Sequence, residues 1–213
     1  MGAVGNPVYV SETRELYRYD IALLPMEDSG LFDLIQDRQS RNEKLGMRSE
    51  RKLYEGCRVK GFELRILRDE AIKLRLDITS ETPPVVYQYT DKCVREKGER
   101  FNGDRVNYRI NGKEHKNIYG VTLASKKEGG TKTELWIKRA LGRDSDFPHL
   151  IEEMTIDAQL LLDKYEQRHF GTFRMTVKRM VLTSDETNIN SADTVIGPLR
   201  YYVAGTVSAE VFE

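Results

Sequence analysis

The sequence predicts a mainly β fold, of the α+β class, with one amphipathic helix lying across a sheet. Several short segments alternate apolar and polar residues, which places one side of each segment against a core. Residue pairs able to form tight turns, such as Asn111-Gly112 and Gly129-Gly130, separate some of these segments. One longer segment, residues 147–168, instead repeats its apolar residues at steps of three and four, as an amphipathic helix does.

A hairpin is predicted in the first half of the chain. Apolar residues occupy alternate positions in 62–66 and again in 72–78, and the short connection between the two runs suits a turn. Further strands are predicted at 17–23, 106–110, 133–138, 172–182 and 206–211.

Two of these strands carry more detailed predictions. The run 106–110 ends in Asn111-Gly112, so its partner strand is expected near 118–123. In 172–182 the apolar phase slips near Lys178-Arg179, which indicates a β-bulge.

The predicted helix carries one apolar stripe, formed by Phe147, Leu150, Ile151, Met154, Ala158, Leu161, Leu162 and Tyr165. Asp144 or Asp146 would cap its N-terminus, and Gly171 follows its C-terminus. A second, shorter helix is predicted over 29–39. The chain shows no internal repeat and no low-complexity segment, so residues 1–213 are interpreted as a single domain.

The charges are plentiful and balanced. Lysine plus arginine and aspartate plus glutamate number 34 each, and charged residues make up 32% of the chain. Such a chain has no overall basic field, which argues against a histone-like protein or a coat protein with a basic arm. The eleven tyrosines and the regular alternation of apolar residues argue against disorder.

The two cysteines, Cys57 and Cys93, lie far apart and belong to no CxxC or Cys/His pattern. Because the N-terminal residues do not resemble a signal peptide, both cysteines are interpreted as reduced thiols. No segment approaches the ~20 apolar residues of a membrane-spanning helix. The sequence therefore predicts a protein that folds in a cytoplasm and has no membrane partner.

No residue pattern is typical of catalysis or metal binding. The three histidines, His115, His149 and His169, are scattered and are interpreted as solvated residues or caps. The motifs GxSxG, HExxH, GxGxxG and GxxxxGK[ST] are absent. We therefore predict no enzyme, no cofactor and no metal, while noting that a site built from scattered carboxylates leaves no short motif.

A series of basic residues precedes the predicted hairpin: Arg38, Arg41, Lys44, Arg48 and Lys52. These residues would share one face of a helix, and that face would suit phosphate or an acidic partner. The alternative is a solvated, flexible loop, which Gly46 and the lack of an apolar stripe favour. Tyr87 and Tyr89 would stack on bases in a single-strand binder, or would enter the edge of a sheet.

Two neighbouring segments resemble a known family. Residues 54–64 read YEGCRVKGFEL, and residues 71–78 read AIKLRLDI. They resemble the Gly-Cys-x-Val strand and its hairpin partner in the major tail proteins of tailed bacteriophages, which are the subunits of the tail tube. The motif covers the central part of the chain, and elsewhere the resemblance is one of strand order plus one helix. The N-terminal residues do not align, and the predicted helix at 147–168 comes later than in the family.

The resemblance implies a small β-sandwich or barrel with a flanking helix and no catalytic residues. Six subunits would pool their sheets into a ring, and rings would stack into a tube through which DNA passes without specific binding. The charged segment 39–55 occupies the place of the family's long loop, which bridges subunits or rings. Its basic residues are therefore candidate contacts: Arg41, Lys44, Arg48, Arg51 and Lys52.

The polar positions of the hairpin, Lys73, Arg75 and Asp77, are candidates to face the lumen of such a tube. A solvated outer face would show the same pattern. The predicted partners are further copies of the chain and other tail proteins such as the tape measure and the terminator. The predicted location is the tail of the virion, after assembly in the host cytoplasm.

Two alternatives stay open. A jelly-roll coat-type protein of a small virus shares the alternating strands, but it would normally carry a basic arm for its genome. A nucleic-acid-binding accessory domain would use the basic series together with Tyr87 and Tyr89.

Overall fold

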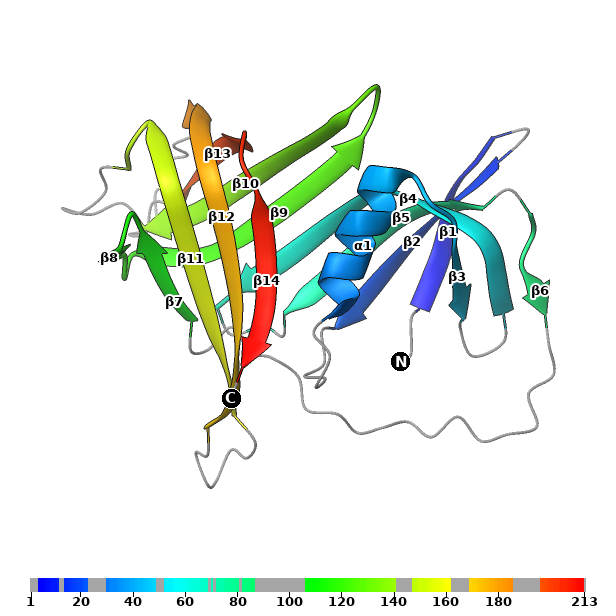
Figure 1. Cartoon of the computed structure of the whole chain (residues 1–213), viewed down its shortest axis with the longest axis horizontal. Coiled ribbons are helices and arrows are strands. Elements are labelled where there is room, and N and C mark those ends of the chain that lie inside the picture. Colours follow the sequence, from blue (N-terminus) through cyan, green and yellow to red (C-terminus); the bar gives the residue numbers. More distant parts are fainter. Residues whose placement is uncertain are drawn as a thin grey trace.

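The computed structural model describes residues 4–11, 14–22, 30–48, 52–68, 70, 72–80, 82–86, 106–140, 147–161, 169–185 and 196–212. Within this part of the chain the fold is mainly β, as predicted, with one helix, α1 (Gly30–Arg41) (Figure 1). The strands are β1 (Val4–Ser11), β2 (Arg14–Ala22), β3 (Leu45–Arg48), β4 (Lys52–Leu67), β5 (Lys73–Ser80), β6 (Val85–Val86), β7 (Val106–Ile110), β8 (Lys113–Glu114), β9 (Ile118–Lys127), β10 (Thr131–Ala140), β11 (Leu150–Leu161), β12 (His169–Asp185), β13 (Ile196–Val203) and β14 (Val207–Phe212). No helix in these residues is long and apolar enough to cross a membrane.

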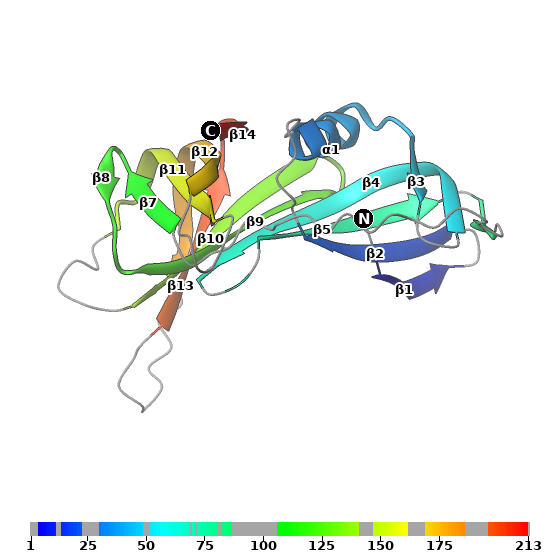
Figure 2. The ribbon, with the colours of Figure 1, turned by 90° about the horizontal axis from the view of Figure 1, so that it is seen from below.

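The strands form one antiparallel sheet in the order β1-β2-β5-β4-β9-β10-β13-β12-β11-β7-β8, with β14 beside β12, and β3 and β6 beside β4. The sheet folds over on itself. Strands β11, β12 and β14 cross β9 and β10 at a steep angle in Figure 1, and Figure 2 places them on one side of those two strands. We call strands β1, β2, β5, β4, β9 and β10 the long layer, and strands β7, β11, β12 and β14 the short layer. Helix α1 lies on the same side of the long layer as the short layer (Figure 2).

A row of leucines crosses the inner face of the long layer. Leu64 of β4 lies opposite Leu74 of β5 on one side and Leu123 of β9 on the other. Leu123 in turn lies opposite Leu135 of β10, and all four side chains are fully buried. Because successive side chains of a strand point to opposite faces, the same alternation that fills the core leaves a polar outer face.

Strand β12 changes its neighbour halfway along. Its first half pairs with β14 as far as Val177, and its second half pairs with β13 from Met180. Between them, Arg179 has a left-handed φ of 54°, which confirms the backbone irregularity predicted near Lys178-Arg179. The strand does not end there.

Gly205 lies opposite this irregularity, between β13 and β14. The amide of Lys178 donates to the carbonyl oxygen of Thr206 at 2.9 Å, and the amide of Ala204 donates to that of Arg179 at 2.8 Å. A Cβ atom at Gly205 would stand 2.3 Å from the carbonyl oxygen of Lys178, so only glycine permits this approach. Because of this junction, the consecutive strands β13 and β14 both pair with β12. Strand β13 also pairs with β10.

Among the described side chains of helix α1, Ile35 and Gln39 are buried. Ile35 is buried in the core, and Gln39 is only 2% exposed. The Gln39 amide nitrogen donates to the carbonyl oxygens of Lys60 and Ser125 at 3.4 Å each, and the Ser125 hydroxyl donates to Gln39 Oε1 at 2.9 Å. The register between β4 and β5 shifts at Lys60, so Gln39 satisfies a carbonyl group at a bulge.

The shorter helix predicted over 29–39 is thus found, two residues longer at its end. Asn42 follows it with a left-handed φ of 56°, and the amides of Asn42 and Glu43 donate to the carbonyl oxygens of Gln39 and Arg38. This is the Schellman arrangement that ends helices. Lys127 of β9 adds hydrogen bonds to the carbonyl oxygens of Gln39 at 2.8 Å and Ser40 at 3.1 Å.

The helix predicted over 147–168 is wrong, because its described residues from Leu150 to Leu161 form strand β11. Two adjacent residues, Glu152 and Glu153, are exposed, so Ile151 and Met154 face the core three positions apart. The amides of both glutamates donate to Asn111 Oδ1, at 3.0 and 3.1 Å. An irregularity within a strand therefore imitates helical spacing.

The hairpin predicted from 62–66 and 72–78 is confirmed as β4 and β5. The turn at Asn111-Gly112 is also confirmed, with φ angles of 50° and 79°. Its predicted partner strand is wrong, since β7 pairs with the short β8 across the turn and with β11 on its other side. The segment 118–123 lies in β9, which pairs with β4 and β10. The turn determines the pairing of only the few residues next to it. After β8 the chain enters the long layer as β9.

The segment 39–55 is not one long loop: its described residues form the end of α1, a short connection at 42–44, strand β3 and the start of β4. Strand β3 and strand β6 pair with opposite sides of the first part of β4. Figures 1 and 2 place these strands at the end of the molecule away from β7 and β8. We call residues 45–48, 52–57 and 85–86 the arm. In the pairing of β3 with β4, Leu45 lies opposite the buried Cys57, and Met47 lies opposite the buried Tyr54.

Candidate functional site

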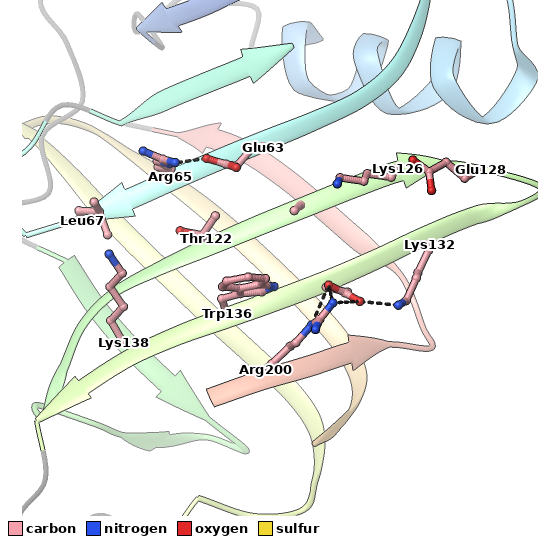
Figure 3. A pocket seen from close by; sticks show the side chains of 12 residues that line it. Glu63, Arg65, Leu67, Thr122, Lys126, Glu128, Lys132, Trp136, Lys138 and Arg200 are labelled. Carbon is pink, nitrogen blue, oxygen red and sulfur yellow. Dashed lines mark hydrogen bonds and ion pairs between the residues drawn. The ribbon is translucent and has the colours of Figure 1, made fainter. Parts of the chain in front are cut away.

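The outer face of the long layer contains a trough along β9. The outward positions at its centre carry the small side chains of Thr122 and Ala124, whereas the neighbouring outward positions on β4 and β10 carry long ones. A row of small side chains between two rows of long ones leaves a hollow of about 590 Å³ (Figure 3). The residues that line this trough are Glu63, Arg65, Leu67, Thr122, Ala124, Lys126, Glu128, Lys132, Glu134, Trp136, Lys138 and Arg200.

One carboxylate of the trough is held by two cations. Arg200 of β13 donates to Glu134 of β10 through Nε at 2.9 Å and Nη2 at 2.6 Å, and Lys132 lies 2.7 Å from Glu134 Oε1 (Figure 3). Burial disfavours the charge on Glu134, but the hydrogen bonds from Lys132 and Arg200 outweigh it and lower the pKa of Glu134.

Replacing Glu134 with glutamine is expected to remove a pH-dependent part of the stability. A carboxyl group whose pKa is lower in the folded state stabilises the fold above its ordinary pKa of 4.5, and this contribution disappears as the pH falls through the folded value. The difference in free energy of unfolding between wild type and Glu134→Gln should be about 1 kcal/mol at pH 7. Urea titrations at pH 7 and pH 3 measure it, and a difference that does not shrink at pH 3 would contradict the assignment.

Trp136 lies beside this ion-paired group and is 43% exposed. It sits opposite Thr122 of β9 and Arg200 of β13, and the Arg200 guanidinium carbon lies 5.3 Å from the centre of its ring. A guanidinium held by a carboxylate on one side of an indole supports the ring from that side. The rest of the indole is open to the trough (Figure 3).

Two lysines of the trough are not neutralised. Lys126 of β9 and Lys138 of β10 make no ion pair and no hydrogen bond within the described residues. Arg65, by contrast, is paired with Glu63 (Figure 3). Of the eight charged residues in the lining, five are basic and three acidic, so the trough is positive in a chain with no net charge.

The outer face of the short layer is charged too, but its charges compensate one another. Arg174 of β12 donates to Asp157 of β11 at 2.6 and 3.0 Å, and these hydrogen bonds raise the pKa of Arg174. Arg109 lies 3.6 Å from the same carboxylate, and Glu210 lies 3.9 Å from Arg174. Arg174 also stands 4.7 Å from the ring centre of the exposed Phe212. Arg174 and Phe212 on this face thus resemble Arg200 and Trp136 in the trough, where an arginine also lies over an aromatic ring.

The basic series, which would share one face if the whole segment were helical, is divided among α1, the connection that follows it, β3 and β4. Arg41 lies in the last turn of α1 and pairs at 2.8 Å with Asp37, which is four residues earlier in the same helix. Lys44 follows the helix, Arg48 ends β3 and Lys52 begins β4. Arg51, together with Tyr87, Tyr89 and Cys93, lies outside the described residues. The common helical face is therefore wrong, whereas a role of these residues in contacts stays a prediction.

Lys73, Arg75 and Asp77 lie on the outer face of β5, as the alternation predicted. Lys73 is opposite Arg65 of β4, and Arg75 is opposite Glu63. The three residues therefore continue the polar face that holds the trough. Trp136 and Lys138 escaped notice in the sequence, because an alternating strand does not show which neighbours its outward residues will meet. The available signal was a tryptophan at an outward position of the strand predicted at 133–138.

Two further titratable side chains, Cys57 and Tyr201, are buried in the core. Burial raises the pKa of the Cys57 thiol, and it raises the pKa of Tyr201 to about 12. The Tyr201 hydroxyl donates to the carbonyl oxygen of Pro148 at 2.9 Å. No three His, Cys, Asp or Glu side chains in the described part of the chain gather in a way that could hold a metal ion.

Comparisons with known proteins give no match, either to a protein-family model or to a curated protein. The outer face of the long layer, with its trough, and the arm are thus the two features on which a functional proposal can be built.

Proposed function

We propose that the protein is a structural subunit of a bacteriophage tail tube, which assembles with copies of itself into stacked hexameric rings. The resemblance of residues 54–64 and 71–78 to major tail proteins suggests this function, and the confirmed β4–β5 hairpin is compatible with it. The observation that carries the proposal is the arm, because it combines exposed apolar side chains with a strand edge that no other described strand covers.

The arm carries the two most exposed large apolar residues of the described chain. Val85 is 56% exposed and Val86 is 69% exposed, and both belong to β6, which pairs with β4 alone among the described strands. An edge strand with apolar side chains and free backbone groups is a site where another chain adds. The arm contains Arg48 and Lys52, which were predicted as subunit contacts.

A contact made by an arm is heterologous, since the arm of one subunit meets a different surface of the next. Repeated heterologous contacts close into rings when the rotation allows, or continue into a tube. In such a tube we place the face with Lys73, Arg75 and Asp77 toward the lumen, through which duplex DNA would pass. Tape-measure and terminator proteins would be further partners, and the subunit would act in the virion without catalysing a reaction.

The proposal is tested by the oligomeric state. Negative-stain electron microscopy of a concentration series, with mass photometry of the same samples, should show six-fold rings or hollow tubes. Closed icosahedral shells would favour a coat protein instead, and a monomer at all concentrations would refute self-assembly.

A double substitution on the arm sharpens this test. Val85→Asp with Val86→Asp should raise the concentration needed for assembly at least ten-fold, because burying one valine contributes about 1.5 kcal/mol or more. Both side chains are exposed, so the monomer should keep its fold. Leu150→Asp on β11 is the matched control, since Leu150 is similarly exposed but lies outside the arm, and it should assemble as wild type does.

A further inference from the structure

We propose that the trough on the outer face of the long layer binds single-stranded nucleic acid, with a base stacked on Trp136 and phosphates beside Lys126 and Lys138. This inference goes beyond ring assembly. A single subunit contributes every residue of the trough, so binding would not require a ring. It also uses a different surface from the basic series and tyrosines that the sequence suggested for nucleic-acid binding.

The first argument is the spacing of the free cations along the trough. Lys138 lies opposite Gly120, which is six residues from Lys126 on β9, so at about 3.3 Å per residue the two lysines are about 20 Å apart along the strand. Trp136 lies opposite Thr122 and therefore between them. Stacked nucleotides rise about 3.4 Å each, so this span matches about six nucleotides.

The second argument is the state of the aromatic ring. Arg200 supports one side of the Trp136 indole and is itself fixed by Glu134, so the ring is held in place before a ligand arrives. A base that stacks on the open part of the ring gains stacking and cation–π stabilisation without ordering a mobile side chain. The small side chains of Thr122 and Ala124 leave the space that the base needs.

The third argument concerns the kind of polyanion. A duplex turns the faces of its bases inward and offers only phosphates and base edges, so it cannot stack on Trp136. An acidic peptide would satisfy the lysines but has no need of the indole. The combination of a supported aromatic ring with two unpaired lysines therefore favours an unpaired strand, and the few free cations favour modest, salt-sensitive affinity.

The chain itself provides the reporter for a test. Trp136 is the only tryptophan, so base stacking should quench the intrinsic fluorescence directly. We would titrate the protein with a single-stranded oligonucleotide of about 12 nucleotides, which is within the usual range of such sites, at low salt. The expected result is saturable quenching, with the logarithm of the affinity falling by about 1.4 per decade of salt, since two phosphates are neutralised at about 0.7 each.

Three variants separate the contributions of base stacking, of phosphate contacts and of the space in the trough. The anisotropy of a labelled oligonucleotide is the readout. Trp136→Ala should weaken binding about ten-fold or more, because stacking of one base is lost. Lys126→Ala with Lys138→Ala should nearly abolish the salt dependence. Ala124→Phe should fill the trough and prevent binding while Trp136 remains.

Matched controls exist on the short layer. Phe212→Ala removes the other exposed ring that faces an arginine, and Lys178→Ala removes an exposed lysine that lies 3.6 Å from Glu153. Both variants should bind as wild type does. Since every substitution lies on an outer face, circular dichroism should show an unchanged fold.

Three results would overturn the inference: no quenching at low salt, equal quenching by a duplex of the same length, or equal binding of polyglutamate. The titration is repeated with the Val85→Asp, Val86→Asp protein, at a concentration at which this variant should not assemble if the proposed function is right. Its binding should be unchanged. Failure of the ring proposal and failure of the trough proposal are thus seen in different measurements.

Discussion

Replacing Gly205 with alanine is expected to lower the free energy of unfolding by about 3 kcal/mol. The Cβ atom of an alanine would stand 2.3 Å from the carbonyl oxygen of Lys178 and 2.9 Å from its carbonyl carbon, and both are backbone atoms that cannot turn away. To relieve the clash, the hydrogen bonds that join Lys178 to Thr206 and Ala204 to Arg179 must lengthen.

Thermal unfolding followed by circular dichroism measures this effect, and a loss of about 3 kcal/mol corresponds to a fall in Tm of about 10 °C for a chain of this size. Gly130→Ala is the control, because nothing lies within 4 Å of a Cβ atom there, and its stability should stay within about 0.5 kcal/mol of wild type. A Gly205→Ala protein as stable as wild type would mean that the junction between β13 and β14 is looser than described.

Replacing Leu123 with alanine is expected to cost about 3 to 4 kcal/mol of stability. Leu123 is fully buried and lies between Leu64 and Leu135, so three strands lose contacts when its side chain is shortened. The surrounding side chains belong to paired strands and cannot collapse far into the space, so the cost should not fall to the lower end of the usual range.

Thr122→Ala is the matched control for this substitution. Thr122 directly precedes Leu123 in β9, but its side chain lies on the outer face. We expect the free energy of unfolding to change by less than about 0.5 kcal/mol. Urea denaturation of both variants decides the question. Equal losses would mean that the two faces of β9 are not as different as the burial of Leu123 and the partial exposure of Thr122 indicate.

Local patterns predicted local structure well. The β4–β5 hairpin, the turn at Asn111-Gly112 and the irregularity near Arg179 are found because each depends on residues close together in the chain. The short helix α1 was likewise predicted within two residues at its end. The error at β11 has the same origin, since the exposed pair Glu152-Glu153 shifts the apolar phase in a way that a local pattern cannot distinguish from a helix.

Partners that are distant in the chain could not be predicted. Asn111 accepts hydrogen bonds from the amides of Glu152 and Glu153. Gln39 donates to the carbonyl oxygens of Lys60 and Ser125. No pattern in the neighbouring sequence indicates either pairing. The trough is the clearest example. Lys126, Trp136 and Arg200 gather only because β9, β10 and β13 become neighbours, and that order depends on the whole sheet.

The position of β13 in the sheet affects the order in which the strands can pair during synthesis on the ribosome. Strands β1 to β10 include all members of the long layer, so this layer can pair while synthesis continues. Strands β11 and β12 emerge next, but among the described strands it is β13, which follows them in the chain, that pairs with both β10 and β12. Until β13 arrives, the edges of both β10 and β12 are open to wrong partners. We therefore expect nascent chains halted before residue 196 to be bound by chaperones far more strongly than chains halted after residue 212.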